Sequence, residues 1–397
     1  MLASQGGSTL KIALVQHRLR RNDGQGRVNL EIVLRALERG HHVTLLCEWI
    51  EPELRENPMV RWIHIPYPGH LSNLVGGEVS AFYANRWLQA HRGEVDVVMA
   101  NGTTTLFPVD MCACHMVHSA WIKSPSHPSN QPGLMNRYQG LYTWVNSKRE
   151  RTAYKLASKV IAVSHKVKSE LIACGVDGDK IEVIVNGVNL DEFHPGAEDR
   201  LGLGLPANVP LGLFVGGLKI PLKNPDTILE AMVKTPEIHV AFAGDATGGP
   251  FPALANKLGV GSRAHFLGFR KDIPALMRAS DFLVFPSRYE AGTLVVLEAL
   301  ASGLPVITAS TVGNSDFVTA DCGIVQDDPN DAVLLAHNME TMSATLHDTL
   351  KRARMSEAAC RSIAGHTWTF MANRYVDIAE RLGGHSRTET RTAVKIG

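Results

Sequence analysis

Two glutamates, Glu290 and Glu298, are the residues of this sequence that are best placed to do chemistry. Before them lies an apolar run at 282–285, which is too short for a helix and fits a buried strand of a parallel sheet. After them Gly303 ends a helix, and residues 304–307 form the next buried strand. Ligands of such sheets bind at the carboxyl ends of the strands, where the N–H groups of a helix N-terminus attract an anion.

This arrangement predicts a ligand that carries both a phosphate and hydroxyl groups. We expect the backbone amides of Gly292, Thr293 and Leu294 to bind the phosphate. Glu290 would accept hydrogen bonds from sugar hydroxyls, and Glu298, farther along the helix, from a second polyol such as a ribose. The pattern therefore indicates a nucleotide-sugar site. The alternative is two solvated carboxylates at a helix start, where acidic residues are favoured in any case.

A lysine, Lys223, follows another apolar strand at 211–215. A cation in this loop would neutralise the charge that builds on a departing diphosphate. Lys219, in the same loop, is a second candidate for that role. The alternative is an exposed lysine ahead of a helix N-terminus, where the helix dipole disfavours a cation. Such a local conflict favours a functional role for Lys223.

The order of motifs along the chain resembles that of the retaining GT-B glycosyltransferases of family 4. Within that family the sequence is most similar to the glucosyltransferases that act on heptose in the lipopolysaccharide core. The resemblance covers most of the chain. Besides the segment around Glu290, it is carried by Gly40-His-His-Val43, Val163-Ser164, Val183-Ile-Val-Asn186-Gly187-Val188, Val215-Gly216 with Lys223-Asn224, Ala243-Gly244-Asp245 and Phe266-Leu-Gly268-Phe.

The resemblance implies an α/β fold of the GT-B type. Two doubly wound Rossmann-like domains would face each other across a cleft, and the C-terminal helix would cross back to the first domain. The donor, a nucleotide diphosphate sugar, would bind mainly to the second domain, and a glycan or glycolipid acceptor to the first. The hexose would be transferred with retention of its anomeric configuration and without an essential metal or other cofactor.

Three further site residues are implied by the resemblance. Gly26, at the start of the first helix, would touch the phosphate or the transferred sugar. His118 would contact the donor sugar from the edge of the cleft and is preferred over His115. The backbone at Arg270 would pair with the nucleotide base.

The sequence departs from the family pattern at two places. Thr293 stands where the family usually has a glycine, so the loop would hold the sugar slightly differently. Gly217 and Leu218 stand where an arginine is common, which leaves the diphosphate to Lys223 and Lys219. These departures keep a non-catalytic sugar-nucleotide-binding protein open as an alternative. A second alternative is a GT-B relative with other chemistry, a phosphorylase or an epimerase.

Two short patterns could suggest a metal. The run 112–118 reads Cys-x-Cys-His-x2-His, which matches none of the usual zinc spacings and has no second cluster after it. Asp177-Gly-Asp179 is formally an Asp-x-Asp motif. It precedes the strand 181–185, where Asp and Gly are common turn residues, and we interpret it as a turn.

Bulk properties favour an ordinary globular protein of two domains. The chain has 397 residues, 45% hydrophobic and 20% charged, with a formal net charge of +1. That charge gives no reason to expect nucleic acid as a partner. Six scattered cysteines fit reduced thiols. We find neither a signal peptide nor an apolar run long enough to span a bilayer, and expect a cytoplasmic protein.

Apolar strands alternate with helical patterns twice along the chain, which predicts two doubly wound units. We expect strands at 11–15, 43–46, 62–65, 95–99, 160–163, 181–185, 211–215, 240–243, 265–267, 282–285 and 304–307. The expected organisation is a first domain at 1–195, a linker at 196–210, a nucleotide-sugar domain at 211–365, a returning helix at 366–382 and a disordered tail at 383–397.

The segment 121–159 combines basic and aromatic residues, with seven Lys or Arg against a single acidic residue. This composition suits contact with an anionic membrane surface, here the inner face of the membrane. An amphipathic helix that packs its aromatic residues inward is an equally good interpretation.

Overall fold

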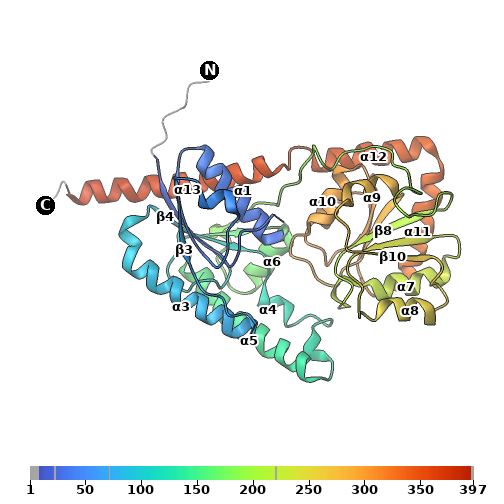
Figure 1. The fold of residues 1–397 in the computed structure, drawn as a ribbon, viewed down its shortest axis with the longest axis horizontal. Helices are drawn as coiled ribbons and strands as arrows, with labels where there is room; N and C mark the ends of the chain where they lie inside the picture. Colours follow the sequence, from blue (N-terminus) through green and yellow to red (C-terminus); the bar gives the residue numbers. More distant parts are fainter. Residues whose placement is uncertain (1–8, 22–23, 71, 220, 395–397) are drawn as a thin grey trace, which may run out of the picture. The chain divides into compact units, whose positions relative to one another are not determined.

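The computed structural model describes residues 9–21, 24–70, 72–219 and 221–394 and divides the chain into two compact units (Figure 1). Unit 1 holds the chain up to Gly187 and again from Trp368, and unit 2 holds Val188–Thr367. Each unit is a parallel sheet with helices on both faces (Figure 1). The expected pair of doubly wound Rossmann-like domains is therefore confirmed.

In the described residues, the sheet of unit 1 has seven strands in the order β3-β2-β1-β4-β5-β6-β7. The elements of unit 1 are β1 (Lys11–Val15), α1 (Gly24–Glu38), β2 (His42–Cys47), α2 (Pro52–Arg55), β3 (Val60–His64), α3 (Asn73–His91), β4 (Val97–Asn101), β5 (Met111–Cys114), α4 (His118–Trp121), α5 (Leu134–Leu156), β6 (Lys159–Ala162), α6 (His165–Ala173), β7 (Ile181–Val183) and α13 (Trp368–Val394).

The sheet of unit 2 has six strands in its described part, in the order β10-β9-β8-β11-β12-β13. The elements of unit 2 are β8 (Leu211–Val215), a 3-10 turn η4 (Pro221–Lys223), α7 (Pro225–Lys234), β9 (His239–Ala243), α8 (Phe251–Lys257), β10 (Ala264–Gly268), α9 (Ile273–Ala279), β11 (Phe282–Phe285), α10 (Leu294–Ala301), β12 (Val306–Ala309), β13 (Gly323–Gln326), α11 (Ala332–His347) and α12 (Thr349–Ile363).

Central strands such as β4 and β11 are buried at every residue, as a parallel sheet covered on both faces requires. Glycines end two of the helices that flank the sheets. Gly40 has φ 80° and donates to the carbonyl of Leu37 at 2.9 Å after α1. Gly303 has φ 67° and donates to the carbonyl of Leu300 at 3.0 Å after α10. Both are left-handed C-caps, and the helix end at Gly303 was predicted from the sequence.

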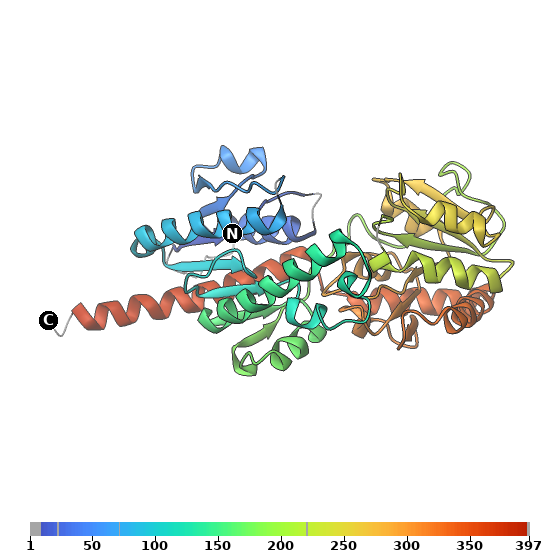
Figure 2. The ribbon, with the colours of Figure 1, turned by 90° about the horizontal axis from the view of Figure 1, so that it is seen from below.

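Helix α13 belongs to the core of unit 1 and packs along α1 (Figures 1 and 2). Its Met371, Tyr375 and Val376 are almost fully buried. At about 1.5–3 kcal/mol for each buried side chain of this size, the helix contributes substantially to the stability of unit 1.

The disorder expected at 383–397 is corrected for residues 383–394, because α13 continues to Val394; residues 395–397 lie outside the described residues. The two glycines at 383 and 384 suggested a helix end. Gly383 instead lets the helix approach the sheet closely: a Cβ there would lie 2.9 Å from Leu10 and 3.1 Å from Val97.

The unit boundary also differs from the expected linker at 196–210. Val188 already belongs to unit 2, where its N–H donates to the carbonyl of His366 at 2.9 Å. Arg200 ties the supposed linker to the same unit, since its Nε donates to the carbonyl of Ala279 at 2.7 Å. Two strands were not expected, β5 and β13, and both are short runs of four residues.

The order of strands reverses direction between β1 and β4 in unit 1 and between β8 and β11 in unit 2. Open α/β sheets bind their ligands at such switch points, beyond the carboxyl ends of the strands. In unit 2 the loops that follow β8 and β11 are those that contain Lys223 and Glu290.

Candidate active site

Lys223 and Glu290 meet at the switch point of unit 2. The ammonium of Lys223 forms an ion pair with Oε1 of Glu290, and Oγ of Ser287 lies 3.3 Å from the same oxygen. The backbone of Glu290 is fixed as well. Its N–H donates to the carbonyl of Thr311 at 3.2 Å, and its carbonyl accepts from Gly313 at 3.0 Å. The two residues that the sequence assigned to phosphate and sugar are thus brought together.

The ammonium of Lys223 lies in a partly dry environment. Its side chain is 28% exposed, and Nζ lies 5.8 Å from the centre of the Phe285 ring. Burial lowers the pKa of Lys223 from 10.5 to about 8, although Glu290 is in contact with it. Burial disfavours the protonated form of this lysine, and a carboxylate lies next to it. A perturbed pKa beside a charged partner is typical of functional sites.

Two buried asparagines hold the loop that carries Glu290, and sequence reasoning did not single them out. Asn224, with φ 65°, donates from Nδ2 to the carbonyl of Pro286 at 2.9 Å at the start of the loop. Asn314 donates from Nδ2 to the carbonyl of Thr293 at 2.8 Å at its end. Both are fully buried. The only sequence signal for Asn224 was its place directly after Lys223.

Arg288 joins the same loop to the segment after β8. Its guanidinium forms two hydrogen bonds to Asp226, of 2.9 and 2.7 Å, in a bidentate pair. Its N–H donates to the carbonyl of Leu222 at 3.0 Å. The segments that carry Lys223 and Glu290 are therefore fixed to each other by backbone and side-chain bonds, and their pairing is pre-organised.

The other predicted donor residues after β11 lie at the start of α10. Thr293 is the N-cap residue, with φ −83°, and Leu294 is the first residue of the helix. Gly292 precedes them, and Glu298 lies half-buried in the helix one turn beyond Leu294. A residue with φ −83° needs no glycine, so Thr293 is compatible with this loop geometry.

Lys219 and Arg270 have other partners in the structure. Lys219 pairs with Asp245 at 2.6 Å, and this hydrogen bond lowers the pKa of Asp245 to about 2. Arg270 binds Asp272 through Nε at 2.7 Å and donates to the carbonyl of Leu203 at 3.2 Å. Neither side chain is brought to Glu290, and the backbone role of Arg270 stays a prediction.

Glycines shape the edge of the sheet next to Lys223. A Cβ on Gly244 would lie 2.0 Å from the carbonyl oxygen of Gly216, so the loops after β8 and β9 touch through their backbones. A Cβ on Gly217 would meet nothing within 4 Å. The site therefore has room for a larger side chain at the position where the family often has an arginine.

The two remaining predicted residues, Gly26 and His118, lie in unit 1. Gly26 is buried in the first turn of α1, while Asp23 of the preceding loop lies outside the described residues. His118 is the first residue of α4, and its ring meets the ring of Tyr142 edge-on at 5.9 Å. Burial lowers the pKa of His118 to about 4, and its buried Nδ1 has no hydrogen-bond partner. Such an unpaired buried atom requires an explanation.

Both short patterns that could suggest a metal lie in defined elements of unit 1. Asp177 accepts from the N–H of Asp179 at 3.0 Å and caps the short turn at 178–180, which confirms the interpretation as a turn. Cys112 and Cys114 lie in β5 with burial raising the pKa of Cys112 to about 12. Among the described residues, no group of three or more His, Cys, Asp or Glu is arranged to hold a metal ion.

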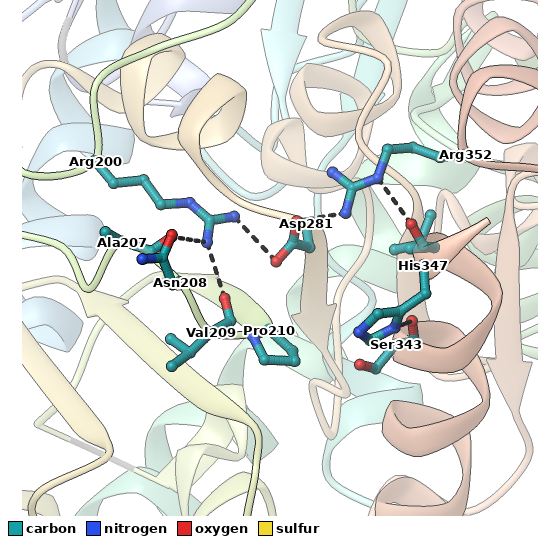
Figure 3. Close-up of a pocket in the computed structure, with 10 residues that line it drawn as sticks. Arg200, Ala207, Asn208, Val209, Pro210, Asp281, Ser343, His347 and Arg352 are labelled. Atoms are coloured by element: carbon teal, nitrogen blue, oxygen red, sulfur yellow. Dashed lines mark hydrogen bonds and ion pairs between the residues drawn. The ribbon is translucent and has the colours of Figure 1, made fainter. Parts of the chain in front are cut away.

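A polar pocket lies at the opposite edge of the unit 2 sheet (Figure 3). Asp281, which precedes β11, pairs there with Arg200 at 3.0 Å and with Arg352 at 2.8 Å. It also accepts from the N–H of Leu211 at 2.8 Å. The charges in this pocket satisfy one another and hold residues 200–210 against the sheet, which indicates a structural role.

The structure shows which side chains of the basic aromatic segment at 121–159 are buried and which are exposed. Trp121 and Tyr154 are buried, as an inward-packing helix requires. The outer face of α5 nevertheless exposes apolar and basic side chains in one stripe. Its members are Leu134, Arg137, Leu141, Trp144, Lys148, Arg151 and Lys155. Within the described part of the chain, no helix has the length and apolar content to cross a membrane.

The fold defines a class: two parallel Rossmann-like sheets of seven and six described strands are those of a GT-B glycosyltransferase. Residues 22–192 match the family described as Glycosyltransferase Family 4, and residues 197–361 match Glycosyl transferases group 1. The two matches follow each other along the chain and together cover most of it, so the chain consists of two glycosyltransferase domains of the GT-B type.

Two curated relatives share one name. The D-inositol 3-phosphate glycosyltransferase of Xylanimonas cellulosilytica is 29% identical over 82% of this chain and 83% of its own length. That of Mycolicibacterium smegmatis is 32% identical over 53% of this chain and 50% of its own length. The chain thus spans about half the length of the second relative and most of the first.

Solved structures agree on the fold. WaaG, a glycosyltransferase involved in lipopolysaccharide biosynthesis, is 22% identical with a TM-score of 0.72, covering 93% of this chain and 99% of its own. The sucrose-phosphate synthase of Thermosynechococcus elongatus has a TM-score of 0.75 at 19% identity, covering 95% and 100%. Anabaena Alr3699/HepE in complex with UDP-glucose has a TM-score of 0.66 at 21% identity, covering 94% and 100%.

Proposed function

We propose that this glycosyltransferase moves a hexose from a nucleotide diphosphate sugar to a hydroxyl group, with retention of anomeric configuration. The observation that carries the proposal is the ion pair of Lys223 and Glu290 at the switch point of unit 2. Without donor the two charges neutralise each other. When donor binds, the ammonium turns to the diphosphate, and the carboxylate accepts from the hydroxyls of the hexose.

The remaining donor contacts follow from placing the donor at the switch point of unit 2. The amides of Gly292, Thr293 and Leu294, at the start of α10, meet a phosphate, because a helix N-terminus carries partial positive charge. Glu298 accepts from the ribose. The backbone at Arg270 meets the base, and Lys219 adds positive potential nearby. Since Anabaena HepE was solved with UDP and with UDP-glucose, we take UDP-glucose as the first donor to test.

Gly26 and His118 are the proposed contributions of unit 1, toward the phosphate and the transferred sugar. A neutral His118, with its pKa near 4, can accept or donate a hydrogen bond to a sugar hydroxyl at neutral pH without adding charge. Retention is proposed to follow a front-face path in which the leaving phosphate helps to deprotonate the acceptor, and no divalent metal is required.

The acceptor is proposed to be a cell-surface glycan or glycolipid precursor, reached at the inner face of the membrane. The exposed stripe of α5 supports this, because it combines Trp144 and two leucines with four basic residues. Such a face suits an anionic lipid surface. Inositol 3-phosphate is the second candidate acceptor, because it is named in the curated relatives.

A donor screen tests the proposal. Purified protein is incubated with UDP-glucose, UDP-galactose, GDP-mannose and ADP-glucose, and release of the nucleoside diphosphate is followed. We expect one donor to be hydrolysed slowly in water and faster with a lipid-linked glycan or with inositol 3-phosphate. Binding of a nucleotide sugar without any turnover would favour the non-catalytic alternative. Formation of a sugar phosphate from free phosphate, or of an epimeric donor, would favour the other GT-B chemistries.

A further inference from the structure

A buried carboxylate on α5 holds the backbone of α4. Glu150 is 1% exposed, and its two oxygens accept from adjacent N–H groups: Oε2 from His118 at 2.8 Å and Oε1 from Ser119 at 2.7 Å. Burial raises the pKa of this carboxyl group, and the N–H donors oppose the shift. Burying a carboxylate is costly, and it is tolerated where its oxygens are satisfied by good donors.

The sequence around α4 explains why the carboxylate must come from elsewhere. The N-cap position of α4 is Val117, whose side chain makes no capping hydrogen bond. Helices usually place Ser, Thr, Asp or Asn there to accept the first N–H groups. Here that acceptor is Glu150, on another helix. The start of α4, and with it the Cα of His118, is therefore fixed by α5 rather than by its own loop.

The same face of α5 reaches two loops at the carboxyl edge of the unit 1 sheet. Tyr142, Asn146 and Glu150 follow one another every four residues and so lie on one side of the helix. The ring of Tyr142 meets the His118 ring at 5.9 Å and 79°. Oδ1 of Asn146 accepts from the hydroxyl of Thr103, after β4, at 3.1 Å.

The imidazole of His118 is itself not anchored through its buried Nδ1, which has no hydrogen-bond partner. Its orientation depends on its backbone, held by Glu150, and on the edge of Tyr142. Both constraints come from α5, and a displacement of either would move the ring relative to a substrate.

We propose that Glu150 is a positioning residue for transfer: it sets the place of His118 by binding the two N–H groups at the start of α4. This inference rests on the role of His118 in the proposed function. Only a carboxylate offers an acceptor oxygen to each N–H. The amide of glutamine has one oxygen, and its NH2 group would face the second N–H without bonding to it.

Glu150→Gln tests the inference in UDP-glucose hydrolysis. We expect kcat to fall roughly tenfold to a hundredfold, as misplacement of a reacting group by about 1 Å does. KM for the donor should stay within about twofold, because the nucleotide is bound by unit 2. In a His118→Ala background the same substitution should cause no further loss. Glu56→Gln, at an exposed glutamate of unit 1, is the matched control and should leave kcat unchanged.

A spectroscopic readout separates positioning from stability. The ring-proton shifts of His118 depend on the nearby Tyr142 ring, so Glu150→Gln should change them even where the thermal midpoint is unaltered. If Glu150→Gln does not fold, Tyr142→Ala carries the same test, since it loosens His118 without burying an amide. It should lower kcat in the parent and have no effect with His118→Ala.

Parent-like kcat in Glu150→Gln, or losses that add to those of His118→Ala, would overturn the positioning role while leaving the proposed function standing. Full activity of His118→Ala would overturn both the role of His118 and this inference. If the parent turns over no donor, the proposed function itself fails. The assay of the parent shows this before any variant is made, so the two failures can be told apart.

Discussion

Raising the pH through 8 should reduce the efficiency with which the free enzyme captures its donor. Lys223 must carry its proton to meet the diphosphate, and burial lowers its pKa to about 8. From pH 7 to pH 9 the protonated fraction of such a group falls about tenfold, and from pH 7 to pH 10 about a hundredfold. Because kcat/KM reports the pKa values of the free enzyme, it should fall by these factors.

The sign of the linked stability change distinguishes this effect from unfolding. The folded pKa of about 8 lies below the 10.5 of an ordinary lysine. Between these values the unfolded chain binds more protons, so the contribution of Lys223 to folding stability rises with pH. Between about pH 8 and pH 10.5, deprotonation of Lys223 should therefore reduce activity while its contribution to folding stability increases. Thermal midpoints recorded at each pH would verify that the protein stays folded.

The assay is the initial rate of UDP-glucose turnover at donor concentrations well below KM, from pH 7 to pH 10 at constant ionic strength. Lys223→Arg is the comparison, because a guanidinium stays protonated throughout this range. Its rate should be lower at pH 7 but should lack the descending limb near pH 8. A limb of the same midpoint in both proteins would assign the titration to the substrate or to another residue and refute the reasoning.

Three further outcomes are expected. Glu290→Gln should fold as the parent does, but its kcat should fall on the order of a hundredfold, since an amide accepts hydrogen bonds from sugar hydroxyls more weakly than a carboxylate. Parent-like turnover with a verified donor would show that Glu290 is not part of the site. Transfer activity should survive EDTA, because in the proposed site Lys223 and the start of α10 supply the positive charge that meets the diphosphate. A loss of activity that magnesium or manganese restores would contradict the proposal. Asp177 and Asp179 would then have to be reconsidered as metal ligands. Gly383→Val should lower the free energy of unfolding by about 1–3 kcal/mol, because the added side chain overpacks against Leu10. Gly384→Ala is the control and should be neutral or slightly stabilising. Equal thermal midpoints in the two variants would show that the end of α13 does not pack closely on the sheet.

Helix ends and buried strands were predicted correctly where the local sequence rule agrees with the tertiary fold. Gly40 and Gly303 end helices because a left-handed residue is needed there, and the helix end at Gly303 was predicted. The buried strand β11 was found from its continuous apolar run, Phe282–Phe285. Strand β5 was missed because its Met-Cys-Ala-Cys sequence is short and resembles part of a metal motif.

Other expectations failed because tertiary contacts overrode a local signal. Gly383 looked like a helix end, and in the structure it permits close packing of a helix on a sheet. The candidate site shows the same limit. The pairing of Lys223 with Glu290 could be inferred from strand ends, but the clamps at Asn224 and Asn314 depend on contacts between loops that are distant in sequence.

The central claim, that Lys223 and Glu290 form the donor site, is tested most directly by calorimetry of UDP binding. In the proposed reaction UDP is the product whose charge Lys223 meets. The parent should therefore bind UDP, and Lys223→Ala should bind it at least about tenfold more weakly. Lys257→Ala, which removes an exposed lysine of α8 in the same unit, should bind UDP as the parent does. Equal UDP affinity in the parent and Lys223→Ala would contradict the account.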